Sequence, residues 1–338
     1  MGEKSLTQAP KDLKESIDWL ALVRRGYEGS KSGGSGKPDK LEEALKQLEG
    51  FKEVKTKVSG DSLSHYIYGL AQALSSGFLG YNGLNGESSS GDGIVLRGES
   101  YTSAYHDRNW EQDDASTYAK IFLCLAPLTY YFITFLYWTC KPSGPWARGT
   151  ITESNVLGKF FTAMGYDQSQ LDQQKTGTTI ANRLGGQDGF PELSDAHPGS
   201  SENSYDAFLK QLGKNYSKTP LFRPLTDCMR LSYAYLKSRH SGHQITDAID
   251  AIKGELVNLS TSLTSGSTSS SHDFSKLTGY ISTLLGEIQG FDPNAVPSPV
   301  APLAGTLTTL TAAGGAGAAY GLNVFGFQDI VKALFGFK

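Results

Sequence analysis

The segment from Ile121 to Cys140 reads IFLCLAPLTYYFITFLYWTC, and the interpretation of the whole chain depends on it. It carries no charge and is flanked by Lys120 and Lys141. About 20 apolar residues match the length of a helix that crosses a bilayer. The segment also contains Pro127 and several tyrosines, whose hydroxyls are better placed in a hydrogen-bonded core or at an interface than at mid-bilayer. The sequence therefore leaves a core helix and a transmembrane helix both open.

Two regions with strict heptad spacing follow later in the chain. Their apolar residues recur at alternating intervals of three and four, which is the 3.5-residue period of packed helices. The first seam contains Ile245, Ile249, Ile252, Leu256, Leu259 and Leu263, and the second contains Phe274, Leu277, Ile281, Leu284 and Ile288. A polar connector at 264–271 joins them. We predict an antiparallel hairpin at 241–290 whose seams face each other, the rest of the domain or a related partner chain.

Residues 1–240 predict a mainly α, multi-helix domain with long Gly- and Ser-rich loops and the aromatic apolar helix at 121–140. Helical periodicity is visible at 10–23, 38–54, 61–74, 156–164, 205–212 and 221–236. The loops are expected at 26–37, 82–114 and 185–204. Because loops lie on the surface and tolerate substitution, we expect variation and recognition to concentrate in these three segments.

The C-terminal part predicts a membrane anchor. Four prolines at 291–302 block a helix and favour an extended strut. Residues 303–327 then carry no charge, and Ala313, Gly317 and Gly321 place a small residue at every fourth position, as in closely packed membrane helices. The tail at 328–338 holds Lys332 and Lys338, which favours a cytosolic C-terminus. A flexible Gly/Ala tail is the alternative interpretation of 303–327.

Charge and motifs argue against several functional classes. The 338 residues include 31 basic and 34 acidic ones, a net charge of −3 with no dense basic patch, so we expect no nucleic-acid partner. No complete phosphate-binding loop or nucleophile elbow is present. His240 and His243 have metal-like spacing but no further ligand nearby, and we expect both to face solvent. We therefore predict no enzyme, no cofactor, and no catalytic, cofactor-binding or metal residues.

The cysteines and the N-terminal residues indicate in which cellular compartment the protein resides. Three cysteines do not make a disulfide framework: Cys124 is expected to be a buried thiol, while Cys140 and Cys228 pair only if both face an oxidising space. The first twenty residues contain charges and no apolar core, so they are not a secretory signal. Of two glycosylation sequons, the one at Asn258 falls inside a heptad region and is expected to be fortuitous.

Several short segments of the sequence resemble segments of a known protein family. They are KSLTQAPKDLKESIDW at 4–19, GFLGY at 77–81, AKIFLCLAPL at 119–128 with LYWTC at 136–140, and GTLTTL at 305–310. In this order they resemble the variant erythrocyte surface antigen-1 family of babesial parasites. Full-size members are longer and carry more cysteines. This chain therefore looks like the N-terminal and C-terminal parts of such a member with a shortened region between them.

The resemblance implies a membrane protein displayed on the infected red cell and exported without a classical signal peptide. It further implies antigenic variation, immune evasion and cell adhesion, with a host-cell receptor or antibodies as partners, and it supplies no catalytic residues. The leading hypothesis is thus a membrane-anchored surface antigen. The alternative is a soluble intracellular helical scaffold or interaction protein whose C-terminal apolar segment packs internally.

Overall fold

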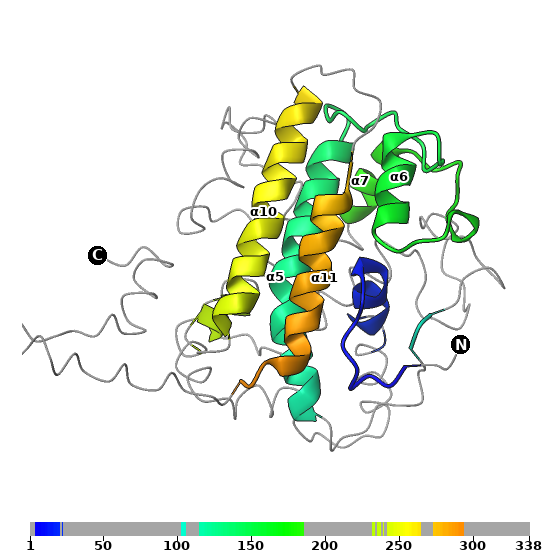
Figure 1. The fold of residues 1–338 in the computed structure, drawn as a ribbon. Helices are drawn as coiled ribbons and strands as arrows, with labels where there is room; N and C mark the ends of the chain where they lie inside the picture. Colours follow the sequence, from blue (N-terminus) through cyan, green and yellow to red (C-terminus); the bar gives the residue numbers. More distant parts are fainter. Residues whose placement is uncertain are drawn as a thin grey trace, which may run out of the picture.

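The computed structural model describes residues 4–20, 22, 103–105, 115–185, 232–233, 235–237, 239, 242–264 and 273–293. This part of the chain is mainly helical, as predicted, and forms no β-strand longer than an isolated bridge. The bridges join Lys4 to Tyr105 and Thr150 to Thr176. The other helices surround one central helix, α5 (Figure 1).

Helix α5 (Ala115–Cys140) is the segment that the sequence left undecided. Among the described residues it alone is long and apolar enough to cross a membrane, yet 94% of its most apolar stretch is buried inside the protein. Two of its threonine hydroxyls are satisfied within the helix, because Thr129 and Thr139 donate to the carbonyls of Leu125 and Phe135 at 2.8 Å. The long apolar helix of the structure is thus internal. The predicted C-terminal transmembrane helix at 303–327 lies outside the described residues.

The predicted hairpin is confirmed in the structure. Helix α10 (Gly242–Thr264) and helix α11 (Ser275–Gly290) run antiparallel, contact each other and both contact α5 (Figure 1). The seam residues are buried, apart from the half-buried Leu263. They belong to the same hydrophobic cluster as α5, so the hairpin docks on the rest of the domain. A partner chain that used these seams would have to displace the protein's own core.

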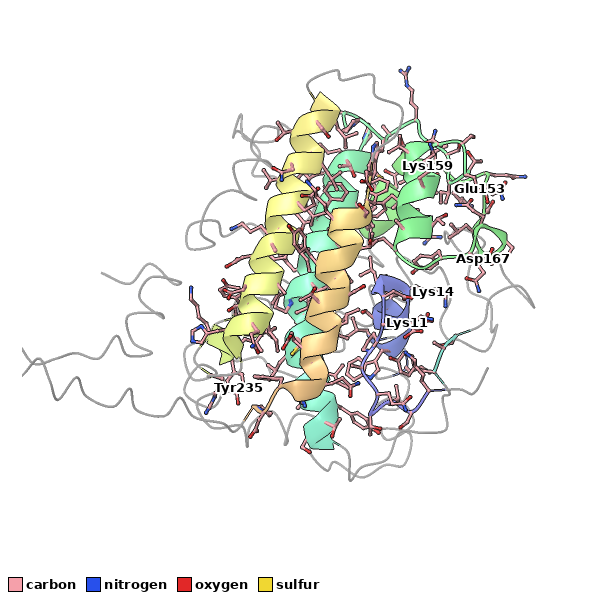
Figure 2. The ribbon with its side chains drawn as sticks, in the orientation of Figure 1. Lys11, Lys14, Glu153, Lys159, Asp167 and Tyr235 are labelled. Atoms are coloured by element: carbon pink, nitrogen blue, oxygen red, sulfur yellow. The ribbon has the colours of Figure 1, made fainter. Side chains whose placement is uncertain are left out.

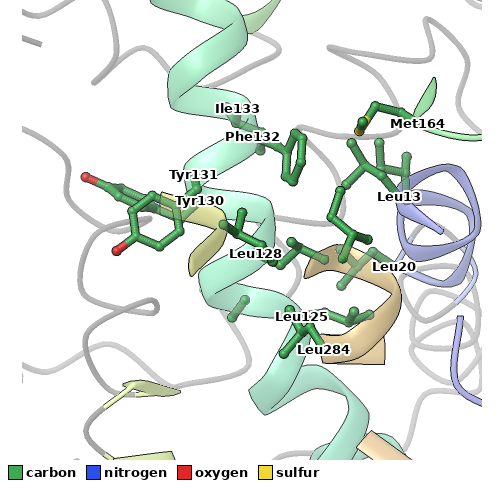
Figure 3. Packing of buried hydrophobic residues seen from close by; sticks show 14 of the residues in the cluster. Leu13, Leu20, Leu125, Leu128, Tyr130, Tyr131, Phe132, Ile133, Met164 and Leu284 are labelled. Carbon is green, nitrogen blue, oxygen red and sulfur yellow. The ribbon is translucent and has the colours of Figure 1, made fainter. Parts of the chain in front are cut away.

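The N-terminal helix at 13–20 follows its predicted apolar stripe. Leu13, Ile17 and Leu20 are buried, and Leu13 and Leu20 point toward α5 beside Met164 and Leu284 (Figure 3). Such burial of a Leu or Ile side chain contributes about 1.5–3 kcal/mol. This helix therefore closes a side of α5 that the hairpin leaves uncovered.

Two short helices follow α5. Helix α6 (Val156–Ala163) was predicted, and the side chain of Asn155 caps it by accepting a hydrogen bond from the backbone of Leu157. Helix α7 (Gly177–Leu184) was not predicted. Its apolar side chains are buried, and it contacts α5. A single 3₁₀ turn, η4 (Gln168–Gln170), lies between them.

Several predicted features lie outside the described residues. They are the helices at 38–54, 61–74 and 205–212, the strut beyond Pro293, the tail at 328–338, the loop at 26–37, and all of the loop at 185–204 except its first residue. Of the predicted loop at 82–114 only 103–105 are described, and of the predicted helix at 221–236 only 232–233 and 235–236, which are helical.

Candidate functional site

The described part of the chain holds no group of three or more His, Cys, Asp or Glu side chains that could bind a metal ion. His243 is exposed at the start of α10, and His240 lies outside the described residues. Cys124 and Cys140 are free and buried, and the possible partner Cys228 is not among the described residues. The polar loops of the described body offer a candidate contact surface instead.

The candidate is a pair of loops at 141–155 and 172–178, which we call the double loop. It follows the C-terminal end of α5 and leads into α6 and α7. Three backbone hydrogen bonds join its two parts: Gly177 donates to the carbonyl of Gly149 at 2.9 Å, Thr178 to that of Ala147 at 2.9 Å, and Ile151 to that of Lys175 at 3.3 Å. The first and third of these form the isolated bridge between Thr150 and Thr176. These bonds fix one loop on the other.

A buried tryptophan anchors the double loop to the core. The Trp146 backbone donates to the Thr139 carbonyl at the end of α5, and its ring centroid lies 5.3 Å from those of Phe135 and Phe160. Gly177 permits the close contact between the loops, because a Cβ atom there would lie 2.1 Å from the Trp146 carbonyl oxygen. The double loop is therefore a preorganised surface although it contains little regular secondary structure.

The outer face of the double loop is polar. A shallow depression is lined by Thr152, Glu153, Ser154 and Gln173. The hydroxyls of Thr150, Thr152 and Ser154 form a chain with oxygen–oxygen distances of 3.2 Å. Glu153 is exposed and has no ion-pair partner among the residues that the structure describes. The depression offers hydrogen-bond donors and acceptors but only one titratable group, so it suits contact with a polar partner better than acid–base chemistry.

Lys141 marks the junction between α5 and the double loop. Its ammonium lies 3.5 Å from the centroid of the Trp138 ring, a cation–π contact that favours the protonated form. Burial acts in the opposite direction and lowers the pKa of Lys141 to about 8. This lysine is consequently a positioned amine at the edge of the candidate surface.

The last described residues, which end at Pro293, lie at the opposite end of the body. The Tyr235 hydroxyl donates to the carbonyl of Pro293 at 2.6 Å, and the Lys120 ammonium donates to that of Gln289 at 3.1 Å. Phe291 between them is buried. Figure 2 places Tyr235 at one end of the bundle and Glu153 toward the other. The root of the predicted strut is thus held beside the start of α5.

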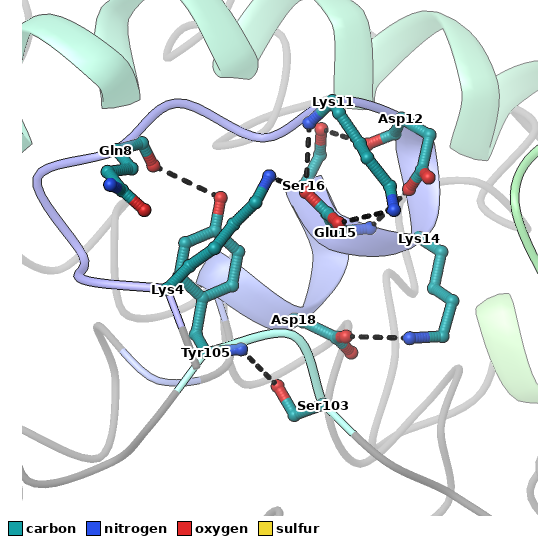
Figure 4. Close-up of polar contacts among 10 residues, drawn as sticks. All are labelled: Lys4, Gln8, Lys11, Asp12, Lys14, Glu15, Ser16, Asp18, Ser103 and Tyr105. Atoms are coloured by element: carbon teal, nitrogen blue, oxygen red, sulfur yellow. Dashed lines mark hydrogen bonds and ion pairs between the residues drawn. The ribbon is translucent and has the colours of Figure 1, made fainter. Parts of the chain in front are cut away.

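A cluster of ion pairs fastens the N-terminal segment (Figure 4). Glu15 accepts from the ammonium of Lys4 at 2.5 Å and from that of Lys11 at 3.1 Å, and its side chain is only 4% exposed. Burial alone would raise the pKa of Glu15, but the hydrogen bonds from these two lysines outweigh it and hold the pKa below its usual value. Lys14 and Asp18 form a second pair at 3.1 Å with both side chains buried.

The same cluster reaches the loop after α6. Gly165 has a φ of 100°, and a Cβ atom there would lie 2.6 Å from the Asp12 carboxyl carbon, so only glycine fits at this position. Burial raises the pKa of Asp12. These groups point at one another rather than into a cavity, which identifies the cluster as a structural clamp.

Comparisons with protein-family profiles, with curated proteins and with solved structures find no match to this chain. The double loop was not singled out from the sequence. The available signals were the turn residues Pro142, Gly144 and Pro145 after the apolar segment, and Thr176 as a helix cap before Gly177. None of them indicates that the two loops contact each other.

Proposed function

We propose that this protein is a membrane-anchored variant surface antigen of an intraerythrocytic parasite, with a helical body held on one side of the membrane by residues 303–327. Its role is antigenic variation and immune evasion, with adhesion to a host-cell receptor as a further role. The proposal rests on the resemblance of the strings at 4–19, 77–81, 119–140 and 305–310 and on the Pro-rich strut before an uncharged segment.

The burial of α5 supports the single-span form of this proposal. Because α5 is covered by α10, α11 and α7, the first of the two charge-free segments already has an apolar environment within the protein. Residues 303–327 are then the remaining segment of spanning length. This supports a single span with the whole described body on one side.

Carbonate extraction of membranes tests the anchor. We expect the full chain to stay in the membrane pellet and a variant that ends at Pro302 to appear in the supernatant with its helical circular dichroism unchanged. Release of the full chain would contradict the anchor. It would favour the soluble helical scaffold, with which the buried α5 is also compatible.

Display at the cell surface needs a separate measurement. We expect an antibody against an exposed segment of α10 to stain intact infected red cells, and to stain them no more strongly after permeabilisation. Staining that requires permeabilisation would place the protein inside the cell and would refute the surface-antigen role while leaving the anchor intact.

A further inference from the structure

We propose that the outer side of α11 pairs with α11 of a second copy of this chain, with the two helices antiparallel. The contact is formed by Lys276, Tyr280, Thr283 and Glu287, which we call the outer row. None of these residues belongs to the buried seam of α11, so the pairing leaves the protein's own core in place. It also needs neither the membrane anchor nor any residue outside the described body.

The outer row is a second heptad pattern on α11, which lies on the outside of the bundle (Figure 1). Its residues recur at intervals of four, three and four, the spacing of side chains that line one contact along a helix. Lys276, Tyr280 and Thr283 are exposed, and Glu287 is half-buried. Within the described ranges Tyr280 is the one large hydrophobic side chain that is exposed, at 38%. Tyrosine is enriched in protein contacts because it buries a large ring and keeps a polar hydroxyl, so Tyr280 supplies an anchor for a partner.

Two glycines beside the outer row give a second helix room to approach. Gly279 and Gly286 are exposed, and a Cβ atom at either position would meet nothing within 4 Å. Glycine is the least favourable helix residue apart from proline, and packing within one copy does not require it at these positions. Its missing side chain does allow another backbone to come close. The two glycines therefore leave space along α11 that a facing helix can fill.

The charges at the two ends of the outer row identify the partner and its direction. Lys276 and Glu287 form no ion pair within the described part of the chain. Because the spacing of the row reads the same in both directions, an antiparallel copy places Lys276 opposite the second copy's Glu287 and Tyr280 opposite its Thr283. The same contacts then occur twice, as a twofold interface requires. A parallel copy would instead set like charges against each other, which is destabilising. The outer row is thus complementary to a second, antiparallel copy of itself.

The size of the contact determines its expected strength. One helix of 16 residues from each copy forms a small interface. Interfaces below about 1,200 Å² are typical of weak or transient complexes, and exposed ion pairs add little to them. We therefore expect a reversible dimer with a Kd on the order of 10 μM.

Charge reversal tests both the pairing and its direction. The full chain is studied by sedimentation equilibrium in a nonionic detergent, at protein concentrations above and below the expected Kd and at several ratios of detergent to protein. Lys276→Glu and Glu287→Lys each replace two attractive pairs by two repulsive ones, so we expect either variant to weaken self-association at least about tenfold. The double variant exchanges the two charges and should dimerise like the wild type. An equimolar mixture of the two single variants should form mixed dimers for the same reason.

Two further variants complete the test. Glu153→Lys changes the net charge as Glu287→Lys does but lies in the double loop, and it should leave association unchanged. Tyr280→Ala should weaken the dimer without a change of charge and without loss of helical circular dichroism, because this side chain is exposed; it serves as the second test if a charge variant misfolds.

Three outcomes would overturn the proposal. The first is a wild-type chain that stays monomeric at every concentration. The second is a dimer that neither single reversal weakens, because such a dimer uses another surface. The third is loss of association that neither the double variant nor the mixture restores, because opposite charges would then not face each other in the antiparallel arrangement.

Discussion

Replacement of Glu15 by glutamine tests whether the N-terminal clamp stabilises the body. The substitution keeps the size of the side chain and one carbonyl acceptor but removes the charge that faces Lys4 and Lys11. Lys4 is 28% exposed and Lys11 68% exposed, so water screens both pairs and each contributes at most about 1 kcal/mol. We expect the free energy of unfolding to fall by about 1–2 kcal/mol in total.

The measurement is urea unfolding of the full chain in a nonionic detergent, followed by far-UV circular dichroism. Glu153→Gln is the matched control, because this carboxylate is exposed and has no ion-pair partner in the described ranges. Surface substitutions of this kind change stability by less than about 0.5 kcal/mol. A Glu15→Gln variant as stable as the control would refute the view that these ion pairs stabilise the body.

The lowered pKa of Glu15 also predicts how the effect of Glu15→Gln on stability changes with pH. Since the pKa of Glu15 is lowered in the folded protein, its charge stabilises the fold fully above the ordinary glutamate pKa of about 4.3. The contribution disappears as the pH falls through the lowered folded-state value. The stability difference between the wild type and Glu15→Gln should therefore be constant near neutral pH and shrink in acid. A difference that does not change with pH would mean that packing, rather than charge, causes it.

Three further predictions concern the hairpin, two glycines and the membrane topology. Ile252→Asp places a charge at a side chain that is 0% exposed, and it should melt the hairpin at a much lower temperature; an unchanged melting temperature would show an exposed seam. Gly279→Ala should stabilise the protein by about 1 kcal/mol in urea unfolding, because the added methyl group meets nothing within 4 Å, whereas Gly177→Ala should destabilise it. Brief protease treatment of intact infected cells should remove the epitopes at 38–58 and 242–263 together; loss of only one would mean that α5 crosses the membrane.

The heptad helices could be predicted because their signal is local. Alternating intervals of three and four identify a helix and its buried face from the sequence alone, and residues such as Ile249 and Ile281 are buried as expected. The same holds for the stripe at Leu13, Ile17 and Leu20. In each case the buried face is defined by residues within one helix, so no knowledge of the neighbouring elements was required.

The double loop and α7 could not be predicted in this way, because their stability depends on residues far apart in the sequence. Thr178 bonds to the Ala147 carbonyl 31 positions away, and Gly177 is needed only because it approaches Trp146 closely. The polar composition of both loops resembles that of any exposed connection. The candidate surface thus results from tertiary contacts that no periodicity encodes.

Whether α5 is a core helix or a transmembrane helix also depends on tertiary contacts. The free energy of burying its neighbours helps to decide between these two interpretations. Moving α5 into a bilayer would cost α5 itself little, because lipid is as apolar as the protein interior. The seams of α10 and α11, however, would lose one of the surfaces that bury them, and side chains such as Ile252 and Leu284 would face water. At about 1.5–3 kcal/mol for each large side chain, even partial exposure of these seams costs on the order of 10 kcal/mol. That is comparable to the whole stability of a domain. The described packing of the hairpin on α5 therefore disfavours a membrane-spanning α5, and we expect an anchored form of this protein to use a segment outside the described body.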